Sequence, residues 1–162
     1  MDTTKSPRHV ALTILLGTAV AGTLDMTEAC VYWGVTKGVA PERIFHTVAS
    51  GLLGKAAFTG GAPAAALGLV AHFSIMAVMV ACYVLAGLKL PILTRRPIVM
   101  GLAYGLATYA VMNYGVLPLS HARHGAPFVL STFVNNLGAH LFMVGVPIAL
   151  IAASREKMTN TA

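Results

Sequence analysis

The sequence predicts an all-α integral membrane protein, an antiparallel four-transmembrane-helix bundle with one interfacial amphipathic helix between the first two spans. Two observations lead to this prediction. The 162 residues are 57% hydrophobic and only 10% charged, with a mean hydropathy of +0.77, whereas about a quarter of the residues of a soluble domain are charged. The apolar residues also fall into four long runs joined by short connections, which make sequence neighbours antiparallel. Residues 1–162 are therefore expected to form a single membrane domain.

The four predicted spans cover about residues 10–35, 62–88, 97–117 and 128–152. A bilayer core of about 30 Å requires about 20 helical residues, and each run is long enough. The first run spans only by continuing through Asp25 and Glu28, because its charge-free part would reach about 22 Å. It then ends near Tyr32 and Trp33, aromatic residues of the type found at headgroup boundaries.

The N-terminal segment has a second interpretation. Lys5 and Arg8, followed by an apolar run and Ala19-Val20-Ala21, also resemble a signal peptide with a small-residue cleavage site. We favour a retained span, because apolar residues resume directly after that site and cleavage would leave an odd three-helix remnant.

A shorter helix is predicted over about residues 41–55. Pro41 is typical of a first helical position, and Ile44, Val48 and Leu52 recur every four residues. The other side carries Arg43, His46, Thr47 and Ser50. Because this segment is too short and too polar to span, we expect it to lie in the membrane interface.

The net charge of +6 is assigned to loops facing anionic lipid, and no nucleic-acid partner is expected. The positive-inside rule places both termini in the cytoplasm, because this orientation leaves more Lys and Arg inside than outside. The inside group is Lys5, Arg8, Lys89, Arg95, Arg96, Arg155 and Lys157, and the outside group is Lys37, Arg43, Lys55 and Arg123.

Polar side chains within the predicted spans are the candidate functional residues. Ionisable groups inside a membrane are costly and usually face the interior of a bundle. Counted from the outer ends of the spans, the candidates lie roughly 6 to 18 Å deep, so they are expected to meet in one pocket open toward the outer face. The six candidates are Asp25, Glu28, His72, Asn113, Asn136 and His140.

Three hypotheses are open for this pocket. It binds or relays protons or a small solute, with Asp25 as the proton-carrying carboxylate, and transport would then imply a homo-oligomer. Alternatively, His72 and His140 hold a haem b as a bis-histidine pair, or hold a metal ion together with acidic residues. In the third hypothesis the polar groups only join helices in a structural or assembly protein. The usual catalytic motifs are not recognisable, so an enzyme is not favoured.

Small residues are expected where helices approach closely. Gly101 and Gly105 are four positions apart and form a small-xxx-small pattern, which allows two helix backbones to come together. They share their helix face with Tyr109 and Asn113, so this face is expected to point inward.

Short motifs from about Gly22 onward match a known group. They are Ala49-Ser50-Gly51-Leu52-Leu53-Gly54, Ala71-His72-Phe73-Ser74-Ile75, Arg95-Arg96-Pro97, Gly101-x-x-Tyr104-Gly105, Met112-Asn113 and Gly138-Ala139-His140. In these the chain resembles the uncharacterised four-span bacterial inner-membrane proteins of the YagU type. The resemblance implies a multi-pass cytoplasmic-membrane protein linked to acid tolerance, with His72 and His140 as matched positions.

Overall fold

The computed structural model describes residues 6–122 and 128–160, and every regular element in these residues is helical. In chain order the elements are α1 Pro7–Lys37, α2 Pro41–Leu53, η2 Gly54–Thr59, α3 Gly61–Gly87, α4 Ile92–Arg95, α5 Pro97–Val111, η3 Met112–Val116, α6 Leu117–Leu119, α7 Leu130–Ala139, η4 His140–Gly145 and α8 Val146–Asn160. The segment η2 is a 3₁₀ helix, whereas η3 and η4 are wide π-helical turns.

Capping residues fix where α1 begins and ends. The Ser6 side chain accepts a backbone hydrogen bond at the start, and Pro7 takes the first turn, where a backbone N–H would have no helical partner. At the other end Gly38 adopts a left-handed conformation with φ of 64°, and its N–H donates to the Gly34 carbonyl. The 31 residues between these ends form one uninterrupted helix that carries both acidic candidates.

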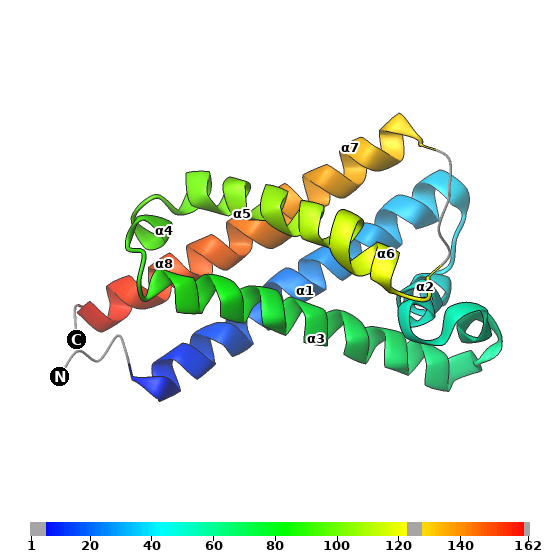
Figure 1. The fold of residues 1–162 in the computed structure, drawn as a ribbon, viewed down its shortest axis with the longest axis horizontal. Coiled ribbons are helices and arrows are strands. Elements are labelled where there is room, and N and C mark those ends of the chain that lie inside the picture. The colour runs from blue at the N-terminus through cyan, green and yellow to red at the C-terminus, as the bar shows by residue number, and fades with distance from the viewer. Residues whose placement is uncertain (1–5, 123–127, 161–162) are drawn as a thin grey trace.

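The long helices pack side by side (Figure 1). α1 contacts α3, and it also contacts η4 and α8, while α5 packs along η4 and α8. The start of α1 and the end of α8 lie at one end of the molecule, and α2 lies at the other (Figure 1). The core between the helices includes the buried side chains of Val80, Tyr83, Val144 and Ile148.

Three helical segments are long and apolar enough to cross a membrane: Pro7–Lys37, Gly61–Gly87 and Leu130–Glu156. They confirm the coarse prediction of a helical membrane protein. The predicted third span, residues 97–117, lies in α5, η3 and α6 and is not among these three. Its average hydropathy is lowered by polar residues such as Tyr104 and Asn113.

The segment predicted as an interfacial helix begins at Pro41 and is helical through Leu53, after which η2 turns the chain into α3. The side of α2 that faces inward carries small and polar residues, because His46, Ala49 and Ser50 are its buried residues. The His46 Nε2 atom lies 2.9 Å from the Gly61 carbonyl oxygen. Leu52 is 58% exposed, so the apolar side predicted from the four-residue spacing faces away from the protein here.

The two π-helical turns were not predicted from the hydropathy pattern. Each ends two residues before a proline, η3 before Pro118 and η4 before Pro147. A proline inside a helix has no N–H to donate, and its ring collides with the carbonyl four residues earlier. A wide turn moves that carbonyl aside, and such turns are often found at functional sites.

The backbones of α5 and η4 touch at three glycines. A β-carbon on Gly105 would collide with the His140 carbonyl, and one on Gly145 would collide with the Gly101 carbonyl. A β-carbon on Gly101 would come within 2.8 Å of the Val146 α-carbon. These obstacles are backbone atoms, which cannot turn away as a side chain can.

We predict that Gly105→Ala destabilises the protein by about 1–3 kcal/mol, because the added methyl group must push two backbones apart. Gly138→Ala is the matched control, since a β-carbon there meets nothing within 4 Å, and alanine favours the helix. Unfolding of both variants in mixed detergent micelles, followed by circular dichroism, gives the comparison. Equal stability of the two variants would contradict the close backbone contact.

Candidate functional site

The first part of the candidate site joins α1 to α3. The Nδ1 atom of His72 lies 4.0 Å from the Oδ2 atom of Asp25, and their side chains are only 11% and 23% exposed. On its other side the ring is held by the backbone, with Nε2 2.9 Å from the Gly22 carbonyl oxygen. Asp25 and His72, two of the six candidate residues, therefore face each other.

The contact with Gly22 determines where a proton can be gained or lost. A carbonyl oxygen only accepts hydrogen bonds, so the Nε2 atom of His72 must carry a proton and donate it. In the neutral ring Nδ1 is then an acceptor, and this atom faces Asp25. A proton taken up by the pair would reside on Nδ1 of His72 or on the Asp25 carboxyl group, which lie 4.0 Å apart.

Gly22 also makes room for the helix that carries His72. A β-carbon at Gly22 would come within 2.6 Å of the Phe73 ring, so the absence of a side chain lets α3 approach α1. The His72 and Phe73 rings meet edge to face, with centroids 5.2 Å apart. One glycine thus supplies both the carbonyl that orients His72 and the space for its neighbour.

The second part of the site links η3 to the segment formed by α7 and η4. The Asn136 amide donates to the Asn113 side-chain oxygen over 3.4 Å, and Asn113 donates to the Tyr109 carbonyl over 2.9 Å. The His140 Nδ1 atom lies 2.9 Å from the Asn136 carbonyl oxygen, and its ring meets the Tyr109 ring edge to face at 5.6 Å. Asn113 lies in η3 and His140 begins η4, so both π-helical turns contribute to this part.

The two parts adjoin through His140, which interacts electrostatically with both Asp25 and Glu28. Glu28 also interacts with Asn135, a residue outside the predicted set. Thr132, Asn136 and His140 recur every four residues along this helix, and that spacing selected Asn136 but not Asn135. Its signal was its position beside Asn136, since two adjacent amides on a helix point about 100° apart and can serve two surfaces.

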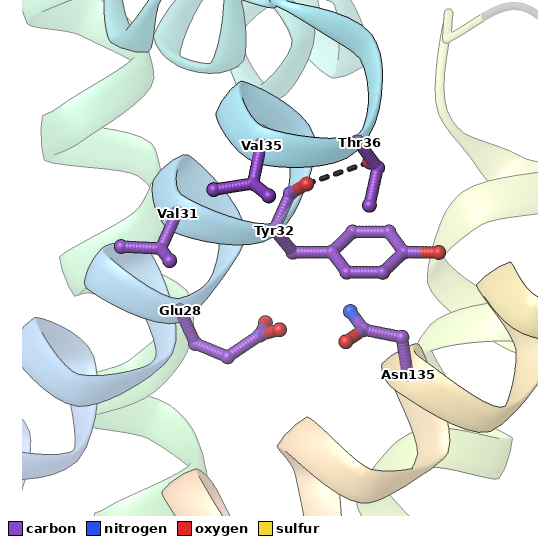
Figure 2. A pocket seen from close by; sticks show the side chains of 6 residues that line it. All are labelled: Glu28, Val31, Tyr32, Val35, Thr36 and Asn135. Atoms are coloured by element: carbon purple, nitrogen blue, oxygen red, sulfur yellow. Dashed lines mark hydrogen bonds between the residues drawn. The ribbon is translucent and has the colours of Figure 1, made fainter.

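A groove of about 310 Å³ opens between α1 and α7 at Glu28. The Glu28 carboxylate and the Asn135 amide face each other across it, and the Tyr32 ring lies beside them (Figure 2). The Thr36 hydroxyl donates to the Tyr32 carbonyl over 2.6 Å. The remaining wall is formed by Val31 and Val35, so the groove combines one acidic group with an aromatic and aliphatic lining.

The donor groups of the site do not favour the metal and haem alternatives. Within residues 6–122 and 128–156, no group of three or more His, Cys, Asp or Glu side chains is placed to hold a metal ion. His72 has Nε2 on the Gly22 carbonyl and Nδ1 facing Asp25, and His140 has Nδ1 on the Asn136 carbonyl. A haem held by both rings would need His72 to turn away from its present partners, so the residues do not fit a bis-histidine site in this arrangement.

Comparison of the chain with protein-family models, curated proteins and solved structures gave no match. The function must therefore be inferred from the geometry of the site.

We predict that Asp25 and His72 stabilise each other measurably. A double-mutant cycle of Asp25→Asn and His72→Gln should give a coupling energy of about 1–2 kcal/mol, because both side chains are shielded from water. The measurement is the free energy of unfolding in mixed micelles.

The chain contains a matched control for this cycle. Glu42 and His46 lie 3.9 Å apart, but the Glu42 side chain is 63% exposed, so Glu42→Gln with His46→Gln should couple by less than about 0.5 kcal/mol. If the two cycles gave the same coupling energy, shielding would not be what strengthens the Asp25–His72 pair.

Proposed function

We propose that this chain is a multi-pass protein of the bacterial inner membrane that binds and relays protons, or a small solute, through the Asp25–His72 pair. The observation that carries this proposal is the pairing itself: a shielded carboxyl group faces the one nitrogen of His72 that can accept a proton. Ionisable side chains within membrane helices usually serve such relays. The resemblance to YagU-type proteins, with their link to acid tolerance, agrees with this proposal.

A fourth span is part of the proposal. Helical geometry continues without a break from Pro97 to Leu119 through α5, η3 and α6, a length of roughly 34 Å at 1.5 Å per residue. The outward side of this segment is apolar, with Ile98, Leu106 and Val111 each more than half exposed. Exposed aliphatic residues on a long helix suit contact with lipid chains.

With four spans both termini lie on the same side of the membrane, and by the positive-inside rule the loop charges favour the cytoplasmic side. α2 then lies at the outer surface, where the exposed Leu52 and Leu53 can enter the lipid interface. Arg43 stacks over the Phe58 ring at 4.1 Å, which keeps a cation at the level of the headgroups. The groove at Glu28 opens in the outer half of the membrane.

A path for protons follows from this orientation. Protons enter at Glu28 in the groove, pass to Asp25 one turn deeper, and exchange with the Nδ1 atom of His72. The next polar side chain on the same face of α1 is Thr18, two turns further in. Its hydroxyl oxygen is buried and has no hydrogen-bond partner among the described residues. A water molecule bridging to this hydroxyl would carry the path inward.

Complete passage requires more than these helices offer in one copy. The Tyr83 and Tyr104 hydroxyls donate to the Leu93 and Met79 carbonyls, so both are committed to structural bonds in the inner half. We therefore include a homo-oligomer in the proposal, with the inner half of the path completed between copies.

A structural or assembly role is the second candidate. Several polar contacts join separate helices, among them His72 to the Gly22 carbonyl and Asn136 to Asn113. Such contacts hold membrane helices together without any ligand. The two roles predict different results when the carboxyl group at position 25 is replaced by an amide of the same shape. Only the relay requires a proton-carrying group at this position.

We predict that Asp25→Asn strongly slows proton movement and leaves the fold intact. Purified protein is reconstituted into vesicles containing a pH-sensitive dye, and flux is driven by a potassium gradient with valinomycin. The native chain should acidify the vesicles faster than empty vesicles, and Asp25→Asn should lower that rate about tenfold or more, as expected for loss of a required proton carrier. Glu42→Gln should retain the native rate. Native flux no greater than that of empty vesicles would favour the structural role instead.

The fourth span gives a prediction of its own. In a chain whose native cysteines are replaced, His121→Cys and Lys55→Cys should react in intact cells with a membrane-impermeant maleimide. Lys89→Cys should react only after the cells are opened, because α5 to α6 would separate it from His121 by one membrane crossing. Equal labelling of Lys89→Cys and His121→Cys in intact cells would contradict the fourth span.

A further inference from the structure

We propose that the groove between α1 and α7 binds a free organic ammonium cation, with Glu28 as its counter-ion and Tyr32 as its aromatic wall. This inference rests on the proposed function and names the class of solute that the site would accept. It comes from the chemistry of the lining residues, which combines one carboxylate, one amide, one phenol ring and aliphatic side chains.

The polar groups of the groove converge on one space. The Glu28 carboxylate points toward Asn135, and the Tyr32 ring lies one helical turn further along α1 above the same space (Figure 2). A carboxylate attracts a cation, and the face of an aromatic ring attracts it as well when the cation lies within about 6 Å of the ring centre. The combination is typical of sites for alkylated ammonium groups, because a fully alkylated nitrogen has no N–H group to donate in a hydrogen bond.

The charges around the groove favour a cation over an anion or a neutral solute. Among the described residues, its lining contains no lysine or arginine, and the second carboxyl group, on Asp25, lies one turn below Glu28 and adds to the negative potential. Lys37 is nine residues beyond Glu28, which places it on the opposite side of α1. The basic side chains beside the two carboxyl groups are histidines: His72 faces Asp25, and His140 interacts with both Asp25 and Glu28.

The size and polarity of the groove favour a free cation over the headgroup of a lipid. Val35 and Thr36 line the part near the end of α1, and Glu28 lies deeper by roughly 12 Å than Thr36. A phospholipid would enter with its headgroup at the surface, next to the aliphatic wall, and its ammonium group would remain far from Glu28. A compact cation with apolar substituents can instead pass the aliphatic wall and reach the carboxylate.

The chain carries its own reporter for binding. Trp33 is the only tryptophan in the sequence, and its ring lies edge to face with Tyr32 at a centroid distance of 5.2 Å. A cation placed against Tyr32 should therefore change the fluorescence of Trp33. Benzyltrimethylammonium is the probe, and neopentylbenzene, which replaces the charged nitrogen by carbon, is the neutral control of the same shape.

Titration of the full-length protein in maltoside micelles tests the inference. Benzyltrimethylammonium should bind saturably, and neopentylbenzene should bind at least about tenfold more weakly, because only the cation gains from the carboxylate. Glu28→Gln should weaken cation binding about tenfold or more. Tyr32→Leu should weaken cation binding roughly fivefold, whereas Tyr32→Phe should bind like the native chain, since the ring face is retained. Glu42→Gln, with its acid outside the groove, should bind like the native chain.

Three results would overturn the inference: equal binding of the two probes, native affinity of Glu28→Gln, or displacement of the cation by phosphatidylcholine added to the micelles, which would assign the groove to a lipid headgroup. The outcome is separate from that of the proton assay. Absence of cation binding with Asp25-dependent proton flux would refute this inference alone, and saturable cation binding without proton flux would refute the relay alone.

Discussion

The arrangement of this protein depends on the need to satisfy polar groups away from water. In a hydrocarbon environment each buried donor or acceptor must find a partner within the protein. His72, on α3, does so by donating to the Gly22 carbonyl on α1, and Asn136 does so by donating to Asn113. The candidate site is thus built from the same contacts that position α1, α3, η3 and α7 relative to one another.

Glycine makes these contacts possible. Because Gly22 has no side chain, the Phe73 ring can lie against α1. The neighbouring residue, His72, is thereby brought within hydrogen-bond distance of the Gly22 carbonyl. Gly105 and Gly145 perform a similar task for α5 and η4, where backbone meets backbone. The polar residues define what the site can do chemically, and the glycines define how near to one another those residues can come.

Much of the fold and part of the candidate site could be predicted from the sequence, and there are physical reasons why the other features could not. Hydropathy predicted a helical membrane protein, and three segments meet the requirements for a span. The cost of charges in lipid selected Asp25 and His72, which face each other at 4.0 Å. The role of Asn135 escaped because a residue beside a polar stripe has no periodic signal. The π-helical turns escaped because a proline predicts a disturbed helix but not how the preceding carbonyls are rearranged.

The contact of α5 with η4 also limits how the molecule can move. Side chains relieve crowding by changing rotamer, but two backbones in contact have no such adjustment. α5 and η4 must therefore shift as one rigid unit, and neither can slide past the other without a collision at Gly101, Gly105 or Gly145. A solute entering between α1 and α7 would instead meet only side chains, because side chains of both helices line the groove there.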